Sequence, residues 1–150
     1  MEKSLVLIKP DGVQRGLIGE IITRLEKKGL QLVAAKFILA SQELAEKHYA
    51  IHYGKPFYAD LISFITSSPV LAMVWKGPDA ITVIRSMMGA TNPTQANPGS
   101  IRFDLGMVVN RNLTHASDGP ETADEEIALW FTPEEIYDWD RSIGHWIFGA

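Results

Sequence analysis

His115 lies in a heptad of small and polar residues, 112–118, between a short apolar run at 107–109 and an expected helix start. Asp118 and Glu121 have the three-residue spacing that caps the first turn of a helix. The imidazole is therefore expected at a strand-to-helix junction, where reactive side chains of α/β domains commonly lie. Because an unperturbed histidine is partly neutral at pH 7, His115 could act as a nucleophile or a base. An ordinary histidine in a polar turn would give the same heptad.

Three cations stand where a polyphosphate could bind. Lys9 directly follows the first apolar run, Arg85 lies near the end of an expected helix, and Arg102 follows the uncharged segment 89–100. Cations supply charge for a polyphosphate, and a loop rich in Gly and Thr supplies backbone and hydroxyl donors. Each cation also has a simpler reading. Lys9 could be a solvated lysine before a turn, and Arg85 could interact with the helix dipole.

Neutral donors and one carboxylate could complete such a site. Thr91 and Asn112 offer a hydroxyl and an amide, although both residue types also cap turns. Glu126 lies in the helix that follows the heptad and could hold one ring nitrogen of His115 while the other attacks. Ser117 could bridge the two side chains. The order of these residues therefore favours a histidine supported by an acid.

The aromatic side chains and the other histidines are less informative. Phe57 follows a Lys-Pro turn and could stack on a base, whereas Phe57 and Tyr49 could equally belong to the core. His48, His52 and His145 have no acidic partner at ligand spacing and are expected at the surface. The sequence has no metal-ligand motif, no GxGxxG and no P-loop, so no protein metal ligand is predicted and a nucleotide would need another binding device.

Composition limits the class of protein. A length of 150 residues favours a single domain, 1–150, and the absence of cysteine excludes disulfides and thiolate metal sites. A net charge of −4 argues against a general nucleic-acid surface. No apolar run approaches membrane-spanning length and the first one is too short for a signal peptide, so a cytoplasmic location is expected.

The elements that must position these residues follow from periodicity. Short apolar runs predict strands, at 5–8, 30–39, 70–75 and 107–109. Apolar residues at helical spacing predict helices, at 17–25 (ended by Gly29), 41–49 (capped by Ser41), 61–65, 78–88 (opened by Pro78) and 121–130. Thr132 to Glu135 has the pattern of a capping box. This order indicates an α/β or α+β sandwich, and it allows a split β-α-β, ferredoxin-like arrangement.

Four segments, in order and at matching spacing, resemble nucleoside diphosphate kinases over nearly the whole chain. They are 9–16 (KPDGVQRG), 91–93 with 98–102 (TNP and PGSIR), 111–118 (RNLTHASD) and 126–131 (EIALWF). The resemblance implies a ferredoxin-like βαββαβ sandwich with a four-stranded antiparallel sheet and added helices. It also implies a ping-pong reaction, in which His115 takes the γ-phosphoryl group of a nucleoside triphosphate and passes it to a nucleoside diphosphate.

The resemblance also assigns roles to individual residues. Contacts to phosphate or sugar are implied for Lys9, Tyr49, Arg85, Thr91, Arg102 and Asn112. Phe57 would stack on the base, and Ser117 and Glu126 would support His115, so the implied catalytic residues are His115, Lys9, Glu126, Ser117 and Tyr49. Mg²⁺ would be bound with the nucleotide phosphates and water. The family implies a homo-oligomer, and the complete loop 91–102 favours a hexamer over a tetramer.

Two residues depart from the family pattern. Ala116 stands where glycine usually follows the histidine, and Asn110 stands where glycine commonly precedes Arg-Asn. If position 116 needs a backbone conformation that only glycine tolerates, alanine would strain the site. A catalytically impaired member that only binds nucleotides or assembles is therefore the alternative. A ferredoxin-like nucleic-acid binder is a second one, which the net charge of −4 opposes.

Overall fold

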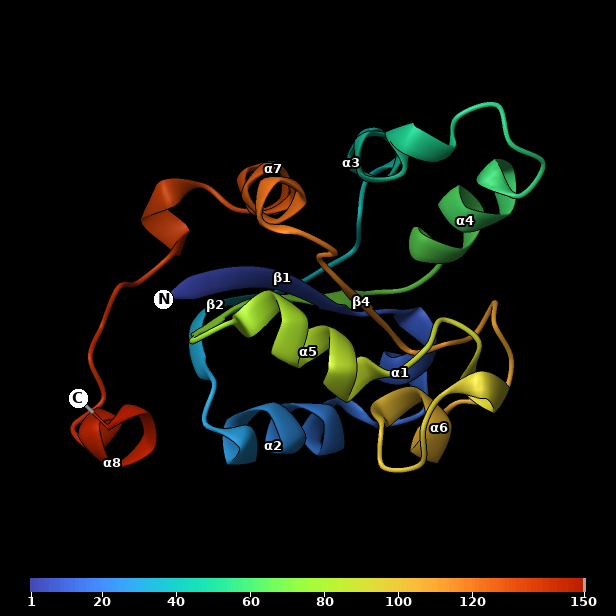
Figure 1. Ribbon diagram of the computed structural model, residues 1–150. Helices are drawn as coiled ribbons and strands as arrows, with labels where there is room; N and C mark the ends of the chain where they lie inside the picture. Colours follow the sequence, from blue (N-terminus) through green and yellow to red (C-terminus); the bar gives the residue numbers. More distant parts are fainter. Residues whose placement is uncertain (150) are drawn as a thin grey trace.

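Four antiparallel strands form one sheet in the computed structural model, which describes residues 1–149 (Figure 1). The strands are β1 (Glu2–Ile8), β2 (Gln31–Ile38), β3 (Val70–Gly77) and β4 (Thr114–Ala116). Their order is β2-β3-β1-β4, with β1 paired to both β3 and β4. This order and the two crossover connections confirm the expected ferredoxin-like fold.

Helices cover both faces of the sheet. The crossover helices α2 and α5 lie on one face, and α3 and α7 lie on the other (Figure 1). The helices are α1 (Pro10–Gln14), α2 (Ile18–Lys28), α3 (Gln42–His48), α4 (Tyr58–Ile65), α5 (Ala80–Met88), α6 (Ile101–Leu105), α7 (Pro120–Trp130) and α8 (Gly144–Phe148), with 3-10 turns at Ala50–His52, Pro93–Gln95 and Pro133–Glu135. No helix within residues 1–149 is long and apolar enough to cross a membrane.

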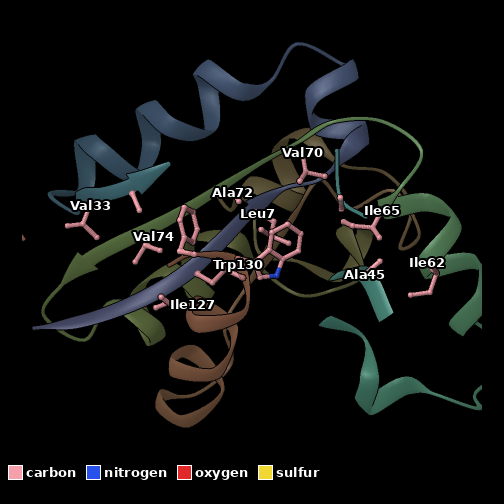
Figure 2. Packing of buried hydrophobic residues seen from close by; sticks show 14 residues of the cluster. Leu7, Val33, Ala45, Ile62, Ile65, Val70, Ala72, Val74, Ile127 and Trp130 are labelled. Carbon is pink, nitrogen blue, oxygen red and sulfur yellow. The ribbon is translucent and has the colours of Figure 1, made fainter. Parts of the chain in front are cut away.

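Strand β1 divides the core into two apolar clusters. Leu5 and Leu7 point toward the α7 side, and Val6 and Ile8 point toward the α2 side. Successive side chains alternate across a strand, so a central strand with both faces covered must be apolar throughout. Figure 2 shows Leu7 packed near Trp130 of α7. The burial of this tryptophan holds α7 on the sheet against β1.

Several local signals are confirmed. Helix α2 ends at Gly29, whose φ of 108° lies in the left-handed region that favours glycine. The Ser41 hydroxyl accepts a hydrogen bond from the Leu44 amide and caps α3. The capping box between Thr132 and Glu135 is also present. In each case the hydrogen-bonded residues are three positions apart in the sequence, so the signal is local.

The expected strand at 107–109 is wrong. These residues are exposed and enter a turn that a bridge between Val108 and Arg111 closes. The fourth strand instead contains His115 itself, paired with Leu7 of β1. The apolar run failed as a predictor because pairing with β1, and not local hydrophobicity, defines this three-residue strand.

Helix starts also differ from the prediction at two places. Asp118 does not cap α7. Gly119 is the N-cap because Pro120 occupies the first helical position. Helix α5 begins at Ala80 and not at Pro78, with Asp79 as N-cap in a left-handed conformation (φ 49°). Helix α6 was not expected, since it lies at the end of the loop that the sequence left unassigned.

Candidate active site

His115 lies in the middle of β4, with its side chain 26% exposed and facing α7. Its Nε2 is 2.9 Å from Oε2 of Glu126. The Ser117 hydroxyl donates to the other carboxylate oxygen at 2.8 Å and accepts the Leu5 amide at 3.1 Å. Glu126 thus contacts both His115 and Ser117, and the Leu5 amide of β1 holds the Ser117 hydroxyl in place.

This hydrogen bonding sets the chemical state of the imidazole. Burial works to raise the pKa of Glu126, but the hydrogen bonds from His115 and Ser117 outweigh it and hold that pKa below its ordinary value. An ionised carboxylate accepts hydrogen bonds only, so Nε2 of His115 carries the proton. The Nδ1 atom then keeps its lone pair. The sequence left open which nitrogen would react, and the geometry favours Nδ1.

A second histidine lies against the first. The prediction that His48 is a surface residue is wrong, since its side chain is 1% exposed and its ring centroid is 4.6 Å from that of His115. The Trp130 indole N–H donates to His48 Nδ1 at 3.1 Å. Burial lowers the pKa of His48 to about 3, so this imidazole is neutral. Its burial depends on the packing of α3 against α7, for which the local sequence holds no signal.

The other two histidines lie farther from this group. His145 is exposed, as predicted, and His52 is partly exposed.

His48, His115 and Glu126 form a set of side chains that could hold a metal ion, with ligand atoms within 4.8 Å of one another. The lone pair of His48 Nδ1 already accepts the Trp130 N–H. The Nε2 of His115 is likewise bonded to the carboxylate. Internal hydrogen bonds therefore close this cluster, and a cation would have to displace them. The cluster is therefore better suited to supporting His115 as a nucleophile than to binding a metal ion.

Lys9, Asn112 and Thr91 form a second group beside β4. The Lys9 ammonium donates to Oδ1 of Asn112 at 2.5 Å, and the Asn112 amide donates to the Thr91 carbonyl at 3.0 Å. Burial lowers the pKa of Lys9 to about 8, with Arg102 and Arg111 acting in the same direction and Asp11 opposing them. The structure thus brings together three of the residues for which the resemblance implies contacts to phosphate or sugar.

The two arginines of the expected site differ in their surroundings. Arg102 is buried and donates to three carbonyls, those of Gly89 (3.0 Å), Asn112 (3.2 Å) and Thr114 (2.7 Å). Burial, with Arg85 nearby, lowers the pKa of Arg102 to about 10. In this structure Arg102 braces the segment before His115.

Arg85 is exposed, and within residues 1–149 its guanidinium donates only to the Ala116 carbonyl, at 3.4 Å. Its guanidinium therefore keeps donors for an anion.

Aromatic rings lead from His115 to Phe57. The ring of Tyr49 lies 4.7 Å from His48 and 6.3 Å from His52, whose ring is 5.2 Å from Phe57. Phe57 is about half exposed and lies at the start of α4. Burial raises the pKa of Tyr49 to about 12, so its hydroxyl keeps its proton. An exposed ring at the end of this row offers a face for a planar ligand.

The concern about Ala116 is not supported. Ala116 has ordinary strand geometry and pairs with Val6, while positive φ among non-glycine residues is found at Asp79 and Leu113. We therefore expect Ala116→Gly to change turnover less than about twofold and to lower the free energy of unfolding by roughly 0.5–1 kcal/mol, because glycine loses more backbone entropy. Steady-state kinetics and urea unfolding check both values. A large gain in turnover would show that alanine does impair the site.

Comparison with known proteins places these residues in context. A sequence model of the family described as nucleoside diphosphate kinase matches residues 2–136. A nucleoside diphosphate kinase of Symbiobacterium thermophilum is 60% identical over 148 residues, which cover 99% of this chain and 98% of that protein. A nucleoside diphosphate kinase of Archaeoglobus fulgidus is 53% identical over 148 residues, which cover 99% of this chain and 98% of that protein. All the residues of the site lie within the matched region.

Solved structures are equally similar. A nucleoside diphosphate kinase family protein from Babesia bovis has a TM-score of 0.96 and 50% identity, covering 99% of this chain and 100% of that one. A halophilic nucleoside diphosphate kinase from Halobacterium salinarum, in complex with CDP, has a TM-score of 0.96 and 52% identity, covering 98% of each chain. Fold and sequence therefore agree over nearly the full length.

Proposed function

This chain belongs to the nucleoside diphosphate kinase family, and from that premise we propose that His115 carries the phosphoryl group between two nucleotides. The activity is that of the family, transfer of the γ-phosphoryl group of a nucleoside triphosphate to a nucleoside diphosphate. The observation that carries the proposal is the 2.9 Å contact between His115 Nε2 and Glu126. It leaves Nδ1 unprotonated in a partly exposed side chain.

In the first half-reaction Nδ1 attacks the γ-phosphorus, an N–P bond forms, and the bond to the β–γ bridging oxygen breaks. The nucleoside diphosphate leaves with the electron pair. The ring gains a positive charge with its proton still on Nε2, and the Glu126 carboxylate stabilises that charge. A second nucleoside diphosphate then attacks the phosphorus in reverse, so no proton has to leave the site.

The remaining charges suit a polyphosphate. Contacts to the phosphates or sugar stay predicted for Lys9, Tyr49, Arg85, Thr91 and Asn112. The Tyr49 ring also packs against His48, which lies beside His115. Arg102 stays a predicted nucleotide contact, and its bonds to three carbonyls support a bracing role in addition. Phosphoryl transfer depends mainly on positioning and on charge stabilisation, which such side chains provide.

Phe57 would stack on the base. Stacking without hydrogen bonds to the base edge discriminates poorly between bases, which suits an enzyme for several nucleotides. The complex of the Halobacterium salinarum relative with CDP supports nucleotide binding by this fold. Mg²⁺ would be held by the phosphates and water, because it prefers oxygen ligands and the nucleotide supplies them.

We also propose a homo-oligomer, with a hexamer favoured over a tetramer. Three consecutive apolar residues, Met107 to Val109, are exposed in the turn before β4. A contiguous exposed apolar segment marks a protein contact. The cytoplasmic location stays a prediction, as does the single domain 1–150.

The proposal is tested by mixing the protein with γ-labelled ATP and Mg²⁺ without an acceptor. We expect about one label per chain, stable in base and lost in acid, as an N-phosphorylated imidazole is. Adding a nucleoside diphosphate should discharge it. Bound nucleotide without label would favour the alternative of a member that binds without transferring.

The pKa of Lys9 predicts an alkaline limit to activity. Burial lowers that pKa to about 8, so the ammonium is present below this pH and lost above it. We expect kcat/KM to fall about tenfold for each pH unit above that value, because affinity follows the protonated fraction. A pH profile of kcat/KM checks this, and in Lys9→Gln the alkaline limb, the fall of kcat/KM above this pKa, should be absent. A flat profile to pH 10 would contradict it.

A further inference from the structure

Two turns that bear site residues are locked together beside β4. The Lys9 amide donates to the Leu113 carbonyl at 2.8 Å, and the Leu113 amide donates to Oδ2 of Asp11 at 3.0 Å. Leu113 has a φ of 76°, in the left-handed region that a leucine rarely occupies. This strained residue lies between Asn112 and His115. The turn at residues 9–12 therefore holds the backbone that aims both side chains.

The contact between the turns is close. A Cβ added at Gly12 would lie 3.1 Å from the Leu113 carbonyl oxygen and 2.7 Å from Ile8 Cγ2. A side chain at position 12 would therefore require the Ile8 side chain and the Leu113 backbone to shift. The Leu113 side chain is fully buried, which fixes its own position. A left-handed conformation persists only where the surroundings enforce it, and here the surroundings include the Asp11 carboxylate.

Asp11 has a second feature that the support of Leu113 does not explain. The residue is buried, and its Oδ1 has no hydrogen-bond partner among residues 1–149. A buried carboxylate with an unpaired oxygen is unfavourable unless a nearby cation offsets its charge. Lys9, two residues earlier, is such a cation. Asp11 favours the charged form of Lys9, whereas Arg102 of α6 and Arg111 of the turn before β4 oppose it, and the nearby His48 is neutral.

We propose that Asp11 is a positioning residue of the phosphoryl-transfer site. Its carboxylate holds the strained Leu113 turn that aims Asn112 and His115, and its negative charge stabilises the Lys9 ammonium. The second part rests on the proposed contact between Lys9 and the nucleotide phosphates.

Asp11→Asn separates the two roles. Asparagine keeps an oxygen that can accept the Leu113 amide, but it removes the charge. We expect the alkaline limb of kcat/KM to move about one unit lower, giving about a tenfold loss on the alkaline side of the limb and little change at pH 6.5. Asp60→Asn, an exposed aspartate in the first turn of α4, is the matched control and should keep the wild-type profile.

Asp11→Ala removes both roles. In addition to the shifted limb, kcat should fall at every pH, and the Leu113 amide should lose protection from hydrogen exchange relative to wild type. Exchange at this one amide reports the hydrogen bond itself, which a general loss of stability would not single out. If alanine prevents folding, the asparagine variant still tests the charge.

Lys9→Gln distinguishes a failure of this inference from a failure of the proposed function. Wild-type kinetics in Lys9→Gln would refute the phosphate contact on which the charge role rests. An impaired Lys9→Gln beside an Asp11→Asn profile that matches wild type would refute the charge role alone. Full protection of the Leu113 amide in Asp11→Ala would refute the anchoring role.

Discussion

Replacing His115 with alanine is expected to abolish phosphoryl transfer, with a loss of at least about 10⁴-fold in turnover. The reason is that the covalent route needs the Nδ1 lone pair, and no other unprotonated nucleophile lies beside Glu126 in residues 1–149. His48 cannot substitute, because its Nδ1 accepts the Trp130 indole N–H. Rapid mixing with γ-labelled ATP, followed by a nucleoside diphosphate, measures both half-reactions.

The same variant should keep its fold and assembly. The His115 side chain is partly exposed on an edge strand, so its truncation leaves no large cavity in either core cluster. His145→Ala, which removes an exposed histidine of α8, is the control and should retain the label and full turnover. Full transfer by His115→Ala would overturn the assignment of the nucleophile. Equal losses in both variants would point to a structural cause.

The sequence predicted the fold well where the signal is local. Helix α2 shows apolar residues at helical spacing and ends at a left-handed Gly29, and β1 and β3 are buried runs long enough to read. Strand β4 could not be found in this way. It has three residues, and its existence depends on a partner more than a hundred positions earlier.

The site follows the same division. His115, Ser117 and Glu126 lie within twelve residues, so helical phase and spacing could bring them together in a prediction. The burial of His48 arises from a contact with Trp130, 82 positions away. Asp11 contacts Leu113 across 102 positions. Such roles depend on contacts that form only in the tertiary fold. They cannot be predicted from a single sequence.

Glu126→Gln is expected to lower kcat about 30-fold and to change nucleotide affinity little. Glutamine has the same shape and can still accept the Nε2 proton of His115, but it carries no charge. A hydrogen bond to a charged group contributes about 1–2 kcal/mol more than a neutral one, which corresponds to about five- to thirtyfold in rate. The difference affects the positively charged phosphohistidine and the transition state that leads to it, because the ring is neutral before transfer.

The measurement separates chemistry from binding. Single-turnover labelling gives the rate of phosphoryl transfer, and titration with a nucleoside diphosphate gives affinity. Glu125→Gln, an exposed neighbour on the same helix, is the control and should match wild type in both. A large loss of affinity with normal turnover would place Glu126 among the nucleotide contacts. That outcome would conflict with the geometry, because the carboxylate binds Nε2, on the far side of the imidazole from the reacting Nδ1.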